Sequence, residues 1–147
     1  MMNVPARRQY GFEWKSRAQY GRYPFVHIAF GVGPDGKLRI AKGIIAIGQF
    51  GIGVITIAQF GAGLLFGFGQ MMAAPVVVGQ IAIGILFAFG QIAAGYIAIG
   101  QVVFAYYGLA QLGLAKYIWT FERKDPEAVA FFKNILERAL TYIRLPL

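Results

Sequence analysis

The sequence predicts an all-β repeat: a four-sided β-solenoid of about four coils, with an N-terminal β-hairpin before it and a C-terminal amphipathic helix after it. Three observations predict this fold class. Residues 43–115 contain no charged side chain and no His. A small residue recurs at every fifth position of that region, and the flanks carry a turn motif and a helix start. We therefore divide the single domain into segments 1–42, 43–119 and 120–147.

The first segment mixes aromatic and basic side chains, with eight bases against two acids. This mixture suits a membrane–water interface, and it equally suits a plain edge strand. No apolar signal-peptide core is visible here, so we expect the chain to reach the cytoplasmic membrane from the cytoplasmic side. Five basic residues are expected to contact anionic lipid headgroups: Arg7, Arg8, Lys15, Arg17 and Arg22.

Residues 25–43 alternate in polarity on both sides of the sequence Gly-Pro-Asp-Gly at 33–36. This pattern predicts a hairpin that caps the first coil by continuing its sheet. Its glycines also spell G-x-G-x-x-G, but neither the following helix nor the acidic residue of a dinucleotide site is present. His27, the only histidine, is expected to lie near Arg39 and to be structural or solvated.

The repeat region divides into fifteen pentads from Gly43 to Trp119, with single extra residues at Phe68 and Phe89. The first position is Gly or Ala in every pentad, and the third is large and apolar in every pentad. Because side chains alternate along an extended chain, these two positions are expected to face the interior. Four pentads would then form one coil.

Glutamine occupies the second position of every other pentad, at intervals of ten or eleven residues. In a four-sided coil these residues would form two ladders on opposite sides, with amides about 4.8 Å apart and able to hydrogen-bond. The ladders could hold the register, or a Gln face could meet another copy or line a polar path. The first ladder would contain Gln49, Gln70, Gln91 and Gln111, and the second Gln59, Gln80 and Gln101.

A small residue, any residue, a large apolar residue and two free positions make a pattern that resembles the pentapeptide-repeat family over about half of the chain. The resemblance implies a quadrilateral β-solenoid. The whole chain is also similar to a group of bacterial Gly-rich hydrophobic repeat proteins whose activity is uncharacterised. The outward positions depart from the family because they are apolar, as at Ile44, Val54 and Leu64. The nucleic-acid functions that go with a polar exterior are therefore not expected here.

The last segment contains a helix start at Asp125-Pro126-Glu127: an N-cap residue, Pro at the first position and an acid in the first turn. An apolar stripe follows, and we expect it to pack over the last coil. The alternative is a helix that lies in a membrane interface. The stripe consists of Val129, Phe132, Leu136, Leu140 and Ile143.

The competing architecture is a bundle of three transmembrane helices, because 73 uncharged residues are long enough for three spans. A helix does not explain the pentads, and each Gly within it would cost about 1 kcal/mol relative to Ala.

The composition does not favour catalysis. No carboxylate pair, metal-ligand cluster or Cys is present, so we expect no enzyme activity, cofactor or metal. The net charge of +8 is divided between the flanks, which favours anionic lipid over nucleic acid as a partner. The first hypothesis is a structural, self-associating or membrane-organising membrane protein. The others are a channel or transporter subunit built from helices, and a soluble self-assembling module that forms homo-oligomers.

Overall fold

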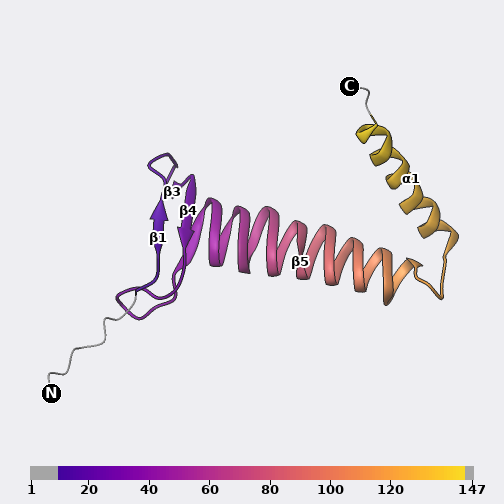
Figure 1. The fold of residues 1–147 in the computed structure, drawn as a ribbon, viewed down its shortest axis with the longest axis horizontal. Coiled ribbons are helices and arrows are strands. Elements are labelled where there is room, and N and C mark those ends of the chain that lie inside the picture. Colours follow the sequence, from indigo (N-terminus) through magenta and orange to yellow (C-terminus); the bar gives the residue numbers. More distant parts are fainter. Residues whose placement is uncertain (1–9, 145–147) are drawn as a thin grey trace, which may run out of the picture.

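The computed structural model describes residues 10–144 (Figure 1). The long strand β5 (Ile40–Trp119, 80 residues) forms the body, and the helix α1 (Pro126–Ile143) follows it. The fold is therefore mostly β with one C-terminal helix, as the sequence predicts. Four short strands precede the body: β1 (Glu13–Lys15), β2 (Gln19–Tyr20), β3 (Tyr23–Pro24) and β4 (Val26–Ala29).

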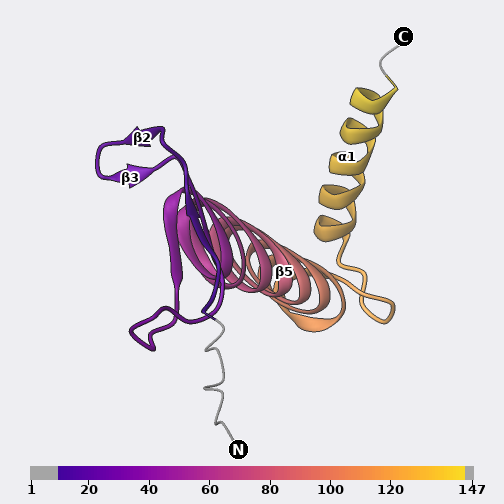
Figure 2. The same ribbon diagram turned by 60° about the vertical axis from the view of Figure 1, so that its left-hand side comes forward.

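The strand β5 winds repeatedly about one axis (Figures 1 and 2). Contacts between neighbouring windings join residues ten or eleven positions apart. A Cβ atom added to Gly53 would lie 2.6 Å from the carbonyl oxygen of Gly43, and one added to Gly95 would lie 2.6 Å from that of Gly84. One winding is therefore two pentads long. The expected coil of four pentads is wrong, because the two sides of the winding pack directly against each other.

The interior of the windings is lined by small residues at the first and fourth pentad positions. Ala46, Ala82 and Ala98 are fully or almost fully buried, and the larger Met72 and Val77 fill the middle. None of the fifteen third-position residues is buried, and several are exposed: Ile55, Phe60, Leu65, Met71, Leu86, Ile92 and Leu112. The expected inward direction of the third position is wrong, because the first and fourth positions already fill the interior of a winding of two pentads.

The alternative of three transmembrane helices is also wrong, because residues 43–115 lie within β5. In β5 the small residues at the first position line the interior, where glycine lets neighbouring windings approach closely. The free-energy cost of glycine in a helix does not apply to a strand.

The N-terminal end of the windings is extended by a small sheet. The strand β4 pairs in parallel with β5, with Val26 opposite Ile45 and Ala29 opposite Gly48. The strand β1 pairs antiparallel with β4, which gives the strand order β1-β4-β5. The strands β2 and β3 form a separate two-stranded sheet.

The predicted hairpin is shorter than expected. The turn is present, since the amide of Gly36 donates to the carbonyl of Gly33 at 3.0 Å and Val32 bridges Leu38. The amide of Arg39 still donates to the carbonyl of Gly31. Beyond that point the chain does not continue as an antiparallel pair, because β4 runs parallel to the first winding of β5.

The helix α1 begins at Pro126 with Asp125 at the N-cap and Glu127 in the first turn, as predicted. The carboxylate of Asp125 does not cap the helix. It accepts a hydrogen bond from the amide of Ile118 at 2.9 Å and one from Nε of Arg123 at 3.1 Å. The bond from Ile118 is the main reason that the pKa of Asp125 lies below its ordinary value. This side chain therefore fastens the end of β5.

The predicted apolar stripe of α1 packs only in part. Ala128 and Phe132 are buried, whereas Leu136, Leu140 and Ile143 are 58%, 46% and 79% exposed. Figure 2 shows the helix leaving the windings at an angle. The expectation that the whole stripe covers the last winding is therefore wrong, because only the first turns of the helix touch β5.

Candidate functional site

The exterior of β5 is apolar along most of its length. Ile52, Ile83 and Leu114 lie on one face and are 55%, 56% and 73% exposed. The opposite face carries the apolar row, which we define as Ile47, Ile57, Phe68, Val78, Phe89, Ile99 and Leu109. Large apolar side chains thus surround a core made mostly of small ones.

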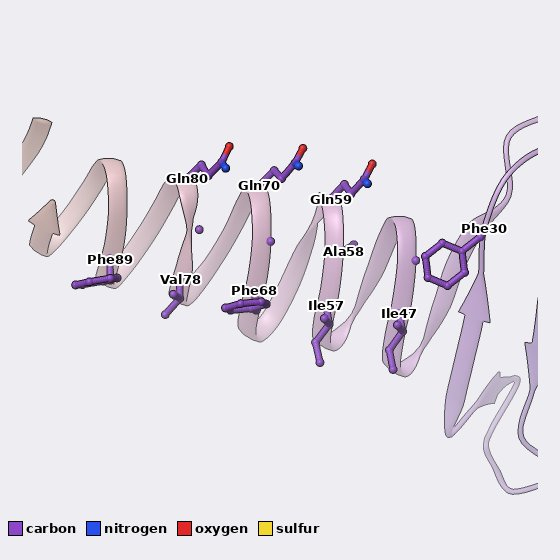
Figure 3. Close-up of a pocket in the computed structure, with 13 residues that line it drawn as sticks. Phe30, Ile47, Ile57, Ala58, Gln59, Phe68, Gln70, Val78, Gln80 and Phe89 are labelled. Carbon is purple, nitrogen blue, oxygen red and sulfur yellow. The ribbon is translucent and has the colours of Figure 1, made fainter. Parts of the chain in front are cut away.

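A shallow groove runs along β5 between the apolar row and a row of amides. Figure 3 shows Gln59, Gln70 and Gln80 projecting from successive windings, with Ile57, Phe68 and Val78 on the other side of the groove. The groove consists of two consecutive hollows of about 560 and 570 Å³. Its floor is made of small residues: Gly48, Ala58, Gly69, Gly79, Gly90, Gly100 and Ala110.

The seven predicted Gln residues share one edge of the windings. Because neighbouring windings join residues ten or eleven apart, Gln59, Gln70 and Gln80 form one row, which Figure 3 shows directly. The expected division into two opposite ladders is wrong for the same reason that the four-pentad coil is wrong. We call this edge the Gln row: Gln49, Gln59, Gln70, Gln80, Gln91, Gln101 and Gln111.

The amides of the Gln row are available to a partner. Gln49 accepts a hydrogen bond from the amide of Gly31 at 3.1 Å, and the other six side chains are exposed. Within residues 10–144, no hydrogen bond joins one Gln side chain to the next. The amides therefore do not hold the register of the windings by themselves.

A polar cluster joins β1 to the start of β5. The amide of Lys42 donates to Nδ1 of the buried His27 at 2.8 Å, and Nε2 of His27 donates to Oε1 of Glu13 at 2.9 Å. Arg39 donates to the other carboxylate oxygen of Glu13, and Lys15 lies 3.3 Å from the first. His27 and Arg39 thus meet at Glu13, a partner that the sequence pattern did not reveal.

The charges around Glu13 determine its protonation. Burial raises the pKa of Glu13, but hydrogen bonds from His27 and Lys15 and the charges of Lys15 and Arg39 outweigh that effect. The pKa of Glu13 consequently lies below its ordinary value of 4.5. The carboxylate is therefore held in its charged form and ties β1 to β4 and β5.

The predicted lipid-contacting residues lie in different places. Lys15 and Arg22 line one hollow beside β5, together with Lys42, which the sequence reasoning did not include. Arg17 is exposed outside this hollow. Arg7 and Arg8 lie outside the described residues.

An aromatic cluster at the C-terminal end was also missed by the sequence reasoning. Tyr96 stacks on Tyr106 with ring centroids 5.0 Å apart, and Phe131 of α1 stacks on Tyr107 at 4.2 Å. Lys116 donates to the hydroxyl of Tyr106 at 3.1 Å. The ten-residue spacing of these tyrosines is the repeat of the winding, so that spacing could have identified the cluster.

Two further observations concern the chemistry available to residues 10–144. None of their His, Cys, Asp or Glu side chains form a group of three suited to a metal ion. The helix within these residues is not long and apolar enough to cross a membrane. The absence of enzyme activity remains a prediction.

No family model matches this chain, and neither a curated protein nor a solved structure is similar to it. The resemblance to pentapeptide repeats therefore stays a prediction that depends on the sequence pattern alone.

Proposed function

We propose that the protein is a non-enzymatic membrane protein whose residues 43–119 form an apolar β-solenoid within the bilayer, with a structural and self-associating role. The observation that carries this proposal is the distribution of side chains: mostly Gly and Ala inside, and mostly Ile, Leu and Phe outside. Burial of apolar surface is the main favourable contribution to the free energy of folding. The apolar side chains on this exterior are removed from water only when they contact lipid or another protein.

The length of the uncharged region fits this environment. Residues 43–115 make about seven windings at ten or eleven residues each. With about 4.8 Å between neighbouring strands, seven windings extend for about 34 Å, close to the roughly 30 Å hydrocarbon core of a bilayer. The charged residues then lie at the two ends, beside the lipid headgroups.

The backbone also suits a dry environment. Lipid cannot satisfy unpaired amides and carbonyls, so a membrane-embedded chain must pair them internally. Strand backbone runs without a break through the 80 residues of β5, β4 pairs with the first winding, and Asp125 accepts a hydrogen bond from Ile118 of the last winding. Fewer backbone amides and carbonyls are therefore left unpaired at the two ends of the windings, where they would meet the headgroups.

Self-association is supported by the Gln row. Exposed amides in hydrocarbon are costly unless they find a polar partner, and polar side chains commonly join membrane segments. Two copies that face each other across their Gln rows would satisfy the amides and cover part of the exposed apolar row beside them.

The proposal is tested by fractionation of the full chain. We expect it in the membrane fraction, resistant to a high-salt wash, extracted by detergent, and with a sheet spectrum in far-UV circular dichroism. A soluble monomer without detergent would contradict the proposal. Discrete oligomers without lipid would instead support the soluble self-assembling module, the third hypothesis.

Crosslinking in detergent tests the role of the Gln row. Replacement of Gln70, Gln80 and Gln91 by Leu should reduce the crosslinked dimer, because the variant keeps the bulk of the side chains and loses the amides. Replacement of the same three residues by Asn should retain more of the dimer. Equal crosslinking in both variants would show that the amides do not hold the copies together.

A further inference from the structure

A hollow of about 390 Å³ opens beside the first winding of β5, where the charged N-terminal sheet meets the apolar body. Basic side chains line it from three separate segments: Lys15 on β1, Arg22 in the turn between β2 and β3, and Lys42 on β5. Segments far apart in the sequence thus bring three cations to one cavity. The chain carries its last cation before the uncharged region at Lys42.

The acid in this hollow is already occupied. The carboxylate of Glu13 accepts from His27, Lys15 and Arg39, all within ion-pair distance. Among residues 10–144, neither Arg22 nor Lys42 forms an ion pair. The hollow is therefore cationic, with two basic side chains free to bind an anion.

A second hollow, of about 420 Å³, adjoins the first and shares Tyr23 and Lys42 with it. Apart from Lys42, its lining is uncharged. Its apolar side chains come from the first windings of β5: Ile44, Ile52, Val54 and Leu64. The cationic cavity thus continues into an apolar one, and the two meet at Lys42, the last charged residue before the uncharged region.

We propose that these two hollows together bind one anionic phospholipid. Its phosphate lies among Lys15, Arg22 and Lys42, and the first part of one acyl chain lies over Ile52 and Leu64. Arg and Lys bind phosphate through charge-assisted hydrogen bonds, and the neighbouring apolar surface accounts for a lipid in preference to a free phosphate. This inference rests on the proposed function, because a membrane brings the lipid to this height of the windings.

The binding experiment uses the full chain in a nonionic detergent, with native mass spectrometry as the readout. We expect one phosphatidylglycerol molecule to bind each chain in preference to phosphatidylcholine. The variant Arg22→Gln/Lys42→Gln should weaken phosphatidylglycerol binding by about tenfold or more. The control Arg17→Gln/Lys37→Gln loses the same two charges outside the hollow and should bind as the unmodified chain does.

Two further arms test the apolar half of the site. Ile52→Ser should weaken phosphatidylglycerol binding, whereas Leu114→Ser, on the same face at the far end of β5, should not. Glycerol 3-phosphate should compete poorly, because it lacks the acyl chain. The inference would be overturned if glycerol 3-phosphate competed as well as phosphatidylglycerol itself. It would also be overturned if the two charge variants lost the same amount of phosphatidylglycerol binding.

The inference and the proposed function fail in different ways. Selective binding of phosphatidylglycerol by a chain that fractionates as a soluble protein would support this site and refute the membrane-embedded solenoid. A chain that enters membranes but does not distinguish phosphatidylglycerol from phosphatidylcholine would support the solenoid and refute this site.

Discussion

At the scale of single residues, the close approach of neighbouring windings determines which side chains the interior accepts. Gly69 lies against the carbonyl of Ala58 on the preceding winding, and an added Cβ atom would overlap that oxygen. Thr56, the buried polar residue of β5, satisfies its hydroxyl by donating to the carbonyl of Ala62 at 2.8 Å. A position that lies against the backbone of the preceding winding, such as Gly69, therefore has no room for a side chain, and a buried polar side chain such as that of Thr56 needs an internal partner.

A Val at position 69 is expected to destabilise the protein by about 2–3 kcal/mol, because the clash is with backbone and the windings must move apart. Chemical denaturation in detergent, followed by circular dichroism, measures the loss. Ala73→Val places a valine at an exposed position four residues away and serves as the control. A control as unstable as Gly69→Val would show that valine, and not the contact, is responsible.

The cluster at Glu13 predicts a dependence of stability on pH. Its pKa is lowered by His27, Lys15 and Arg39, so the carboxylate stabilises the folded chain fully above its ordinary value of 4.5. This contribution disappears as the pH falls through the lowered pKa of the folded state. In urea titrations, Glu13→Gln should therefore be less stable than the unmodified chain at pH 7, and the difference should shrink as the pH falls below 4.5. A gap that stays constant over this range would contradict the assignment, and the exposed Glu122→Gln is the control.

At the scale of elements, α1 is divided into a docked part and a free part. Phe131 and Phe132 hold its start against β5, whereas its second half exposes an apolar stripe. A helix with one apolar face and one charged face is suited to lie in a membrane interface. This is the alternative that the sequence also predicts for α1. The aromatic contact at Tyr107 thus holds the first half of the helix against β5, and the second half leaves its apolar stripe exposed.

The two parts of α1 should respond differently to truncation. Phe132→Ala is expected to cost about 3 kcal/mol, because the ring is buried where the helix meets the last windings. Leu140→Ala should change stability by less than about 0.5 kcal/mol in detergent, since its side chain is 46% exposed. Hydrogen exchange of the helix amides separates the two cases. Equal losses would mean that the whole stripe is docked.

At the scale of the whole molecule, the sequence predicted the period but not the size of the winding. The pentads indicated extended segments with small residues inside, and β5 agrees with this. The same pattern is compatible with two or four pentads per winding. In either case Gln49 and Gln59 occupy the second position of a pentad and have the same kinds of residue on both sides. What decides is the volume of the interior: Ala46, Gly51 and Ala82 leave space for only two layers in contact. The site at Lys42 was missed because it depends on tertiary contacts between distant segments.

A deletion series tests the size of the winding directly. Removal of the ten residues 69–78 takes out one winding and keeps the spacing of Gln59 and Gln80 at eleven residues, the interval that separates Gln59 from Gln70 in the full chain. We expect this variant to fold, with a sheet spectrum and a melting temperature within several degrees of the full chain, because every remaining contact finds an equivalent partner. Removal of only the five residues 74–78 should be far more disruptive. It puts Gln70 and Gln80 five residues apart, so the two amides fall on opposite edges and the later windings are rotated by half a turn. In a coil of four pentads, by contrast, both deletions would misalign the windings and only the removal of about twenty residues would be tolerated.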